Sequence, residues 1–311
     1  MKYITDLNVK IEENTVITLG KFDGLHRGHE LLMENLFAIA KERNLKTVVF
    51  TFNIPPNKDR EKDAQVLTTN SEKKEVFEET GLDYLFECPF TKEVMQMSPE
   101  RFIEWIVTAL GVKAMVVGTD FRFAHKRMGN VETLKQYADV YGYSLLVLDK
   151  VTDEGREISS TYVREEIAKG NIKKANALLG YPFFVKNKVV HGKKLGRKIG
   201  IPTINMEVPL SKIVPPNGVY VSQVRMEDKL YPSVTNVGCK PTVNEEKTVG
   251  IETHIIGYAS DLYDRRLKVE FLDFIRSEKR FDSVEQLKQQ MSLDIAYVKK
   301  QLTVTKMLQR D

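Results

Sequence analysis

The sequence predicts two domains of different class: an α/β domain with a parallel sheet over residues 1–180, and an antiparallel barrel or sandwich with a C-terminal helix over residues 181–311. The chain has 311 residues, enough for two domains of ordinary size. In the first part, short apolar strands alternate with amphipathic helices, which is typical of a parallel sheet covered on both faces. In the second part, short strand-like runs are punctuated by Gly and Pro, as in antiparallel β proteins.

The elements of the first domain follow from periodicity and capping residues. Ser98 is a good N-cap, Pro99 suits the first helical position, and Gly111 ends the same helix. We expect strands over 15–19, 46–52, 114–117 and 144–148, and helices over 28–43, 98–110 and 131–141. In a parallel sheet of this kind the ligand site lies at the carboxyl ends of the strands.

The second domain begins near Leu179–Pro182, where the pattern of alternating strands and helices gives way to short strands. Apolar and β-branched residues mark its strands, and the closing helix starts after Asp282 or Ser283 as its cap. We expect strands over 218–224, 229–238, 252–258 and 266–274, and a helix over 284–302.

The composition is that of an ordinary globular protein, with 42% apolar residues, 29% charged residues and a net charge of +4. These values exclude a disordered or low-complexity chain. No apolar run approaches the roughly 20 residues that span a bilayer, and the N-terminus lacks the apolar core of a signal peptide. The two cysteines, Cys88 and Cys239, lie too far apart for a zinc ribbon or a disulfide framework. We therefore expect a cytoplasmic protein.

Basic residues gather in the second half of the chain. Residues 1–180 carry 25 basic and 28 acidic side chains, net −3, whereas residues 181–311 carry 22 and 15, net +7. No acidic residue lies between Glu166 and Glu207, a stretch that holds nine Lys and Arg residues. Such a local field attracts anions, either nucleic acid or a small phosphate ligand. A solvated basic surface has the same composition and stays an alternative.

The turn after the first predicted strand carries the first motif, GKFDGLHRGH at residues 20–29. Its glycines let the backbone approach a ligand closely, and the following helix start offers unpaired N–H groups and a positive dipole to phosphate. The spacing of three residues places His26 and His29 on one side of that helix start. We predict a site that stabilises phosphoryl charge. A glycine turn with two surface histidines is the alternative, and a zinc site lacks further ligands.

This motif resembles the signature of the nucleotidyltransferase superfamily, in the form found in bacterial FAD synthetases. The segments GTDFRF (residues 118–123) and ISSTYVR (residues 158–164) resemble two further motifs of that family. The resemblance implies a Rossmann-like domain in which His26, His29 and Arg164 hold phosphate charge during adenylyl transfer. Asn53-Ile54-Pro55-Pro56 lacks the family's histidine, and Ala124 replaces its glycine. The residues implied in nucleotide binding here are Gly20, Phe22, Asp23, Gly24, Gly28, Asp120, Ser159, Ser160 and Thr161.

A second motif, VHGKKLGRKIGIPTIN, occupies residues 190–205. Its three spaced glycines permit a phosphate to lie against the backbone. The Thr203 hydroxyl and the Asn205 carbonyl project to the same side of an extended chain. Both are neutral oxygen ligands, and Mg²⁺ needs few protein ligands when substrate phosphates supply the others. A polar strand edge after a mobile hairpin is the alternative interpretation.

The second motif resembles the riboflavin kinase family, and the likeness continues at residues 216–220, 236–242, 251–254, 262–264 and 274–281. By position, Glu252 corresponds to the catalytic base of the family, and Thr203 and Asn205 to its metal ligands. Asp264 replaces a glycine, and Asp tolerates left-handed turn geometry. His254 and Cys239 are expected to be structural. The resemblance implies nucleotide binding by Gly192, Gly196, Arg197, Lys198, Pro202 and Thr203, and flavin binding by Arg276, Lys279 and Phe281.

Together the two resemblances span nearly the whole chain, in the order of the bacterial bifunctional riboflavin kinases/FMN adenylyltransferases. They imply a C-terminal barrel that converts riboflavin and ATP to FMN and ADP. They also imply an N-terminal domain that converts FMN and ATP to FAD and diphosphate, and both steps need Mg²⁺. We expect small-molecule partners (riboflavin, FMN and ATP), with no nucleic acid, membrane or obligate protein partner.

Two alternatives stay open. One is a riboflavin kinase with an inactive or weak N-terminal domain. The other is a flavin-responsive regulator that binds nucleic acid through the basic stretch. That stretch overlaps the phosphate loop and has few interleaved aromatic residues, so binding of a small phosphate ligand explains it better.

Overall fold

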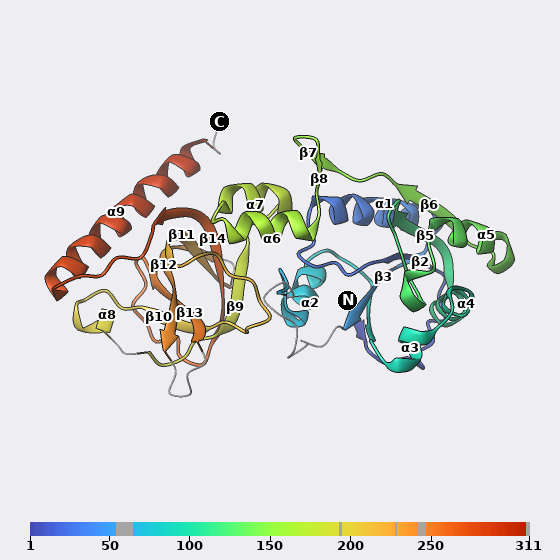
Figure 1. Ribbon diagram of the computed structural model, residues 1–311, viewed down its shortest axis with the longest axis horizontal. Coiled ribbons are helices and arrows are strands. Elements are labelled where there is room, and N and C mark those ends of the chain that lie inside the picture. Colours follow the sequence, from blue (N-terminus) through green and yellow to red (C-terminus); the bar gives the residue numbers. More distant parts are fainter. Residues whose placement is uncertain (54–64, 193–194, 228, 242–246, 309–311) are drawn as a thin grey trace. The chain divides into compact units, whose positions relative to one another are not determined.

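A computed structural model describes residues 1–53, 65–192, 195–227, 229–241 and 247–308 of the chain. The chain divides into two compact units, Met1–Ser160 and Thr161–Asp311, each built on a six-stranded sheet (Figure 1). Helices α6 (Ser160–Ala168) and α7 (Ile172–Leu179) fall almost wholly in the second unit by this division. The functional boundary at residue 180 stays a prediction.

The first unit has a parallel sheet with the strand order β1-β4-β3-β2-β5-β6, as the sequence predicts. Its strands are β1 (Lys2–Ile4), β2 (Thr15–Leu19), β3 (Lys46–Asn53), β4 (Tyr84–Pro89), β5 (Val112–Gly118) and β6 (Ser144–Leu148). Its helices are α1 (Arg27–Arg43), α2 (Asn70–Glu78), α3 (Lys92–Gln96), α4 (Pro99–Leu110) and α5 (Val131–Tyr141), with a short hairpin of β7 (Thr152–Asp153) and β8 (Arg156–Glu157). The elements β1, α2, β4 and α3 were not expected from the sequence.

Both faces of this sheet are covered. On one face, Val16, Val49 and Leu85 pack with residues of α1 and α2 in one apolar cluster. On the other face, Ile17 and Phe50 pack with residues of α4 and α5 in a second cluster. Because side chains alternate along a strand, each inner strand contributes to both clusters. The carboxyl ends of the strands are therefore left as the edge at which loops can build a site.

The predicted caps of α4 are confirmed. The Ser98 hydroxyl accepts a hydrogen bond from Arg101 N (3.3 Å), Pro99 opens the helix, and Gly111 follows it at φ +62°. Two other left-handed positions bear on the sequence comparison. Asp264 has φ +65°, as expected for a residue that replaces glycine, and Ala124 has φ +63°, so it keeps the backbone conformation that a glycine favours.

The second unit is a nearly closed antiparallel barrel with the strand order β10-β13-β12-β11-β14-β9. A bridge between Val190, just after β9, and Asn205 on β10 connects the two ends of the sheet. The expected barrel is thereby confirmed. Its strands are β9 (Phe184–Lys188), β10 (Ile204–Glu207), β11 (Gly218–Met226), β12 (Lys229–Pro241), β13 (Lys247–Ile255) and β14 (Arg266–Arg276), joined by α8 (Leu195–Lys198) and followed by α9 (Val284–Leu308).

Helix α7 is part of the fold of this barrel. The Asn176 side chain donates a hydrogen bond to the Phe271 carbonyl on β14 (2.9 Å) and accepts one from Phe183 N (2.7 Å). Ala175 and Leu178 of the same helix are buried. These contacts explain why the compact unit begins before residue 180.

Candidate active sites

The first site is the turn between β2 and α1, at the carboxyl edge of the parallel sheet. Gly24 has φ +83°, and a Cβ there would lie 2.5 Å from Leu67 Cδ1, so only glycine fits. The Asp23 carboxylate accepts hydrogen bonds from Leu67 N (2.8 Å) and Thr68 N (3.0 Å). The turn is thus held against the segment that leads into α2. Phe22, at φ +47°, is fully buried beneath it.

The two histidines of this turn lie together. His26 is the N-cap residue of α1 and His29 lies in its first turn, and their rings stack with centroids 3.8 Å apart at 22°. The Phe22 ring lies 4.9 Å from that of His29. A Cβ on Gly28 would come within 3.2 Å of the His26 ring, so this glycine leaves room for the stack. The sequence prediction that the histidines share one side of the helix start is confirmed.

Burial dominates the electrostatics of His29. Burial first, and then the neighbouring His26 and Lys73, hold the pKa of His29 well below its ordinary value. The Nδ1 atom of His29 is buried and has no hydrogen-bond partner among the described residues. An uncharged imidazole at a helix N-terminus can donate a hydrogen bond to phosphate oxygen, as the helix N–H groups do.

The other residues of the first motif set lie in different surroundings. The Ser160 hydroxyl donates to the Asp23 carbonyl (2.7 Å), which joins the ISST segment to the turn. Asp120, just after β5, pairs with Lys150 (3.1 Å). Thr161 and Arg164 belong to the second compact unit, where Arg164 Nη2 donates to Thr161 Oγ1 (3.2 Å). Roles of Gly20, Ser159 and these residues in nucleotide binding stay predictions.

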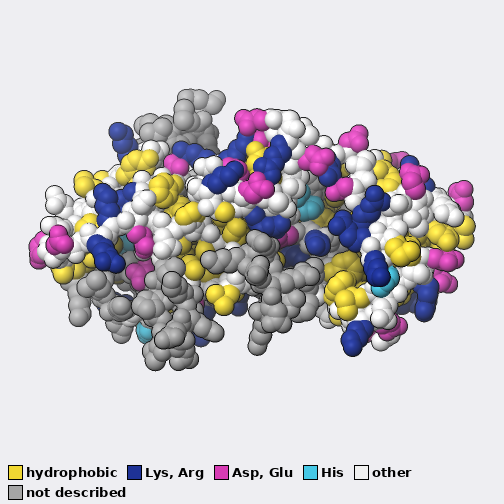
Figure 2. Space-filling view, in the orientation of Figure 1, with side chains coloured by type: hydrophobic (Ala, Val, Ile, Leu, Met, Phe, Trp, Pro, Cys, Tyr) yellow, Lys and Arg dark blue, Asp and Glu magenta, His cyan; other side chains and the backbone are white. Residues whose placement is uncertain are grey.

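The visible face of the first unit carries charges of both signs, and Figure 2 shows Lys and Arg side chains interspersed with Asp and Glu. Attraction of phosphate to this unit therefore depends on local donors at the start of α1 and not on the net charge of the surface.

The second site lies where three strands of the barrel run side by side. Asn205 on β10, Glu252 on β13 and Asn236 on β12 are register partners in one row. Asn205 is buried, and a Cβ on Gly192 would lie 2.4 Å from its Nδ2 atom, so the glycine of the loop and the asparagine are closely packed. Glu252 was singled out only by family resemblance. The structure places it directly beside the predicted metal ligand.

Two cavities meet at Thr203, which lines both. One has a volume of about 510 Å³ and the other about 420 Å³, each large enough for a small organic ligand. Glu252 lines the larger cavity, and Arg197 and Pro202 line the smaller. Of the two residues that the sequence assigns to the metal, Thr203 is therefore shared by the two cavities, whereas Asn205 lines neither.

The larger cavity contains the predicted flavin residues. Arg276, Lys279 and Phe281 line it, and the Arg276 guanidinium lies 6.0 Å from the Phe281 ring. The guanidinium also forms a bidentate pair with Asp294 of α9, with Nη2–Oδ2 2.7 Å and Nε–Oδ1 3.1 Å. One wall is apolar and is made by α9 residues at helical spacing, namely Leu287, Met291 and Ile295. The 4-residue spacing of these three residues was the available sequence signal for this wall.

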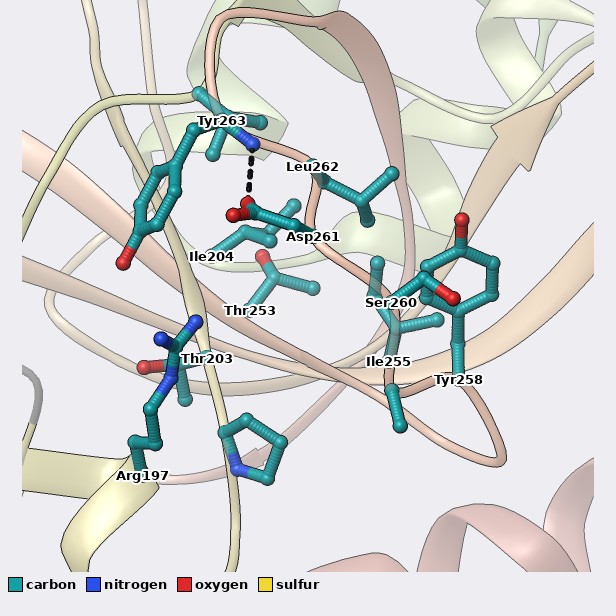
Figure 3. A pocket seen from close by; sticks show the side chains of 13 residues that line it. Arg197, Thr203, Ile204, Thr253, Ile255, Tyr258, Ser260, Asp261, Leu262 and Tyr263 are labelled. Atoms are coloured by element: carbon teal, nitrogen blue, oxygen red, sulfur yellow. Dashed lines mark hydrogen bonds between the residues drawn. The ribbon is translucent and has the colours of Figure 1, made fainter.

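The smaller cavity is shown in Figure 3. Arg197 is directed toward the ring of Tyr263, with its guanidinium carbon 5.8 Å from the ring centroid. Asp261 Oδ1 accepts a hydrogen bond from Tyr263 N (3.0 Å), which fixes the loop that carries the tyrosine. A cation beside an aromatic ring suits a ligand with a flat base and phosphates. The sequence analysis included Tyr263 in the matched segment 262–264 without assigning it a role, and it missed Tyr258. The place of both in this cavity depends on the loop after β13.

The donors at Thr203 and Asn205 fit a hard divalent cation. Both offer neutral oxygen atoms, which suit Mg²⁺ held mainly by substrate phosphates. Among the described residues, no group of three or more His, Cys, Asp or Glu side chains is placed to hold a metal.

The Nδ1 atom of His254 lies 2.8 Å from the Pro202 carbonyl oxygen, and the residue also lines the larger cavity, so a purely structural role stays a prediction. Several residues named from the sequence lie outside the described part of the chain: Ile54, Pro55, Pro56, Lys193, Lys194 and Thr242, together with the side chains of Lys198 and Cys239.

The fold and the two sites define a two-domain transferase that handles nucleotide phosphates. The FAD synthetase family matches residues 8–162, and the riboflavin kinase family matches residues 179–302. The bifunctional riboflavin kinase/FMN adenylyltransferase of Escherichia coli (strain K12) is 37% identical over 296 residues, 94% of each chain. That of Bacillus subtilis (strain 168) is 34% identical over 288 residues, 91% of each chain. The chain belongs to the family of bifunctional riboflavin kinases/FMN adenylyltransferases.

A solved structure shares the fold. A crystal structure described as a macrolide-efflux protein from Streptococcus pneumoniae matches with a TM-score of 0.86 and 30% identity, over 96% of this chain and 98% of the other. The efflux description applies to that protein. In the described part of this chain, no helix is long and apolar enough to cross a membrane.

Proposed function

We propose that the protein makes FMN from riboflavin and ATP in its barrel, and FAD from FMN and a second ATP in its parallel-sheet unit. The observation that carries the proposal is the position of Glu252. It lines the larger cavity, lies beside Asn205 across two strands, and is close to Thr203, the residue that lines both cavities. A carboxylate at that point can reach a substrate hydroxyl in one cavity while a nucleotide phosphate occupies the other.

In the kinase reaction, the flavin lies in the larger cavity against the apolar wall of α9, with Arg276 and Phe281 beside its ring. ATP lies in the smaller cavity, with its phosphates near Arg197 and the glycines of the 192–200 loop. Glu252 takes the proton from the ribityl 5′-hydroxyl, whose oxygen attacks the γ-phosphorus of ATP, and ADP leaves. Phosphoryl transfer needs mainly positioning and charge neutralisation, which agrees with so few acidic side chains at the site.

In the adenylyl transfer reaction, an oxygen of the FMN phosphate attacks the α-phosphorus of ATP, and diphosphate leaves. His26 and His29 donate hydrogen bonds to the phosphate oxygens, where negative charge grows, and the N–H groups of the first turn of α1 add to this. Arg164 is proposed to neutralise charge at the same phosphates. No covalent intermediate with the protein is required.

Thr203 and Asn205 would hold Mg²⁺ in the barrel. When bound, this ion supplies charge neutralisation at the ATP phosphates. We further propose that both reactions take place in the cytoplasm, where ATP is available and where the two separate cysteines stay reduced.

The proposal is tested by incubating the protein with riboflavin and Mg-ATP and separating riboflavin, FMN and FAD by chromatography. We expect FMN to appear first and FAD after it. FMN without FAD would select a riboflavin kinase whose first unit is inactive. The absence of both FMN and FAD would contradict both enzymatic functions.

A further inference from the structure

The first unit contains buried polar side chains that the proposed reactions do not use. Thr51 on β3 and Glu87 on β4 are register partners near the carboxyl ends of their strands, and Lys73 comes from the first turn of α2. Their side chains are almost completely buried, with Lys73 8% exposed, Glu87 2% and Thr51 0%. We refer to these three residues as the buried polar cluster.

The buried polar cluster shares a face of the sheet with His29. Val49 and Leu85, two residues before the cluster on the same two strands, pack with α1 and α2, and side chains two apart on a strand project to the same face. The Phe22 ring connects the two helices on this face, at 5.6 Å from Phe77 of α2 and 4.9 Å from His29 of α1. The cluster and the stacked histidines therefore lie under the same turn.

The cluster is incompletely hydrogen-bonded, which is costly for buried charge. Among the described residues, the Lys73 ammonium donates one hydrogen bond, to Thr51 Oγ1, and this bond is long, 3.4 Å. One oxygen of Glu87 accepts a hydrogen bond from the Tyr3 hydroxyl, and the other has no partner among the described residues. A lysine with a purely structural role would be expected to form shorter and more numerous bonds. The arrangement instead leaves its charge available to neighbouring groups.

The charge of the Lys73 ammonium acts on His29. Burial lowers the pKa of Lys73 itself, while Glu87 and Asp23 oppose that shift and favour the charged ammonium. The charge of Lys73, added to burial and to His26, lowers the pKa of His29. The titratable groups that act on His29 are thus His26 from the turn and Lys73 from α2, and Asp23 and Glu87 act in turn on Lys73.

We propose that Lys73 is a positioning residue for adenylyl transfer, which acts through the buried polar cluster beneath the turn to hold the His29 imidazole stacked on His26. This inference rests on the proposed function of the first unit. In this state His29 donates one ring N–H to the substrate phosphate and does not bind a second proton. Neutral histidines at helix N-termini serve as hydrogen-bond donors to developing negative charge in other enzymes.

The test uses the full-length protein and the variant Lys73→Met, which keeps the length and apolar stem of the side chain and removes its charge. We expect kcat for FAD formation from added FMN to fall about 10²-fold, the effect of a small misplacement at a reacting centre. The acidic limb of its pH profile, measured over about pH 5 to 9, moves to higher pH. The riboflavin kinase rate stays that of the wild type.

Two matched variants separate charge from other effects. Lys73→Arg keeps a positive charge and restores the pH profile, and Lys41→Met removes an exposed charge from α1 and leaves both activities unchanged. Equal loss of both activities with a lower Tm in Lys73→Met would show a structural lysine and overturn the inference.

A measurement without substrate tests the electrostatic link directly. The chain has five histidines, so their ring signals can be followed by NMR in the unliganded protein. We expect His29 to titrate at higher pH in Lys73→Met than in the wild type. An unchanged titration of His29 in Lys73→Met overturns this inference but not the proposed function. The same holds if the wild type makes FAD and Lys73→Met makes it with the same kcat. A wild-type protein that makes no FAD overturns the proposed function and this inference with it.

Discussion

The stacked pair His26 and His29 explains how imidazole rings at a helix start can hold phosphate by hydrogen bonds. Two imidazolium rings with centroids 3.8 Å apart would repel each other, and the positive end of α1 adds to that repulsion. The pair is therefore most stable with His29 uncharged, as its lowered pKa indicates. Such rings bind phosphate oxygen by directed hydrogen bonds, which strengthen as charge grows during the reaction.

Replacement of His29 by alanine tests this role. We expect FAD formation from added FMN to fall by roughly 10² to 10³, about 3 kcal/mol, the cost of one preorganised donor to developing charge. Alanine favours helix, but the His29 ring packs on His26 and Phe22, so we expect a modest fall in melting temperature with FMN formation unchanged. Both activities are measured in the same preparation. Equal damage to FMN formation would mean that His29 supports the fold instead.

Glu252 is proposed to have a different kind of role, in which its carboxylate takes a proton. Glu252→Gln keeps the shape and hydrogen-bonding capacity of the side chain but removes its basicity. FMN formation is expected to fall by about 10² to 10⁴, the usual contribution of a general base. Riboflavin binding, followed by fluorescence titration, and FAD formation from added FMN stay unchanged. A wild-type kinase rate in this variant would show that the proton goes to another group.

Helix α9 shapes the larger cavity through one buried ion pair. Breaking such a pair by removing one partner costs about 3–5 kcal/mol, because the remaining charge is buried alone. We expect Asp294→Ala to lower the thermal stability of the barrel and to raise KM for riboflavin, because Arg276 loses the carboxylate that holds it.

The double variant Arg276→Met/Asp294→Leu separates these two effects. Replacing a buried ion pair by apolar residues is often neutral for stability. The double variant is therefore expected to melt near the wild type while KM for riboflavin stays raised. A normal KM in the double variant would contradict a role of Arg276 in flavin binding.

The glycine at position 192 leaves room for the Asn205 side chain in the barrel site. In Gly192→Ala the new Cβ would lie 2.4 Å from Asn205 Nδ2, so the asparagine must move. A displacement of this size at a reacting centre lowers the rate by about 10². We expect the rate of FMN formation to fall accordingly and the Mg²⁺ concentration that gives half of the maximal rate to rise. FAD formation from added FMN is the internal control. An unchanged Mg²⁺ requirement would argue against Asn205 as a metal ligand.

The extent of the barrel unit can be tested with two fragments. A fragment of residues 161–311 contains α7, whose Asn176 bonds to Phe271 and whose apolar face is buried. A fragment of residues 179–311 begins at the boundary predicted from sequence and lacks this helix. Each buried Leu or Ile stabilises by about 1.5–3 kcal/mol. We expect both fragments to phosphorylate riboflavin when folded, but the shorter one to melt at a clearly lower temperature. Equal stability would place the boundary near residue 180.

The sequence predicted the parallel sheet, the barrel and both motif sets, because these depend on local patterns of glycines and apolar residues. It did not predict β1, which has only three residues, or β4, whose apolar run is interrupted by a buried Glu87. Lys73 and Asp294 look like solvated charges in polar helices, and only the packing of those helices against sheet and cavity buries them. Burial of a charged residue is a tertiary property, so periodicity alone does not reveal it.

Thr203 is the one described residue that lines both cavities of the barrel. A flavin-like ring and a nucleoside joined by a tether that passes Thr203 can therefore occupy both at once. Once one half is bound, the other meets its own cavity at an effective concentration in the millimolar range or above, so the joined compound gains on the order of 10²–10⁴ over either half. The barrel is accordingly a favourable target for bisubstrate inhibitors. Their selectivity for this protein would come from the distance between the larger and the smaller cavity.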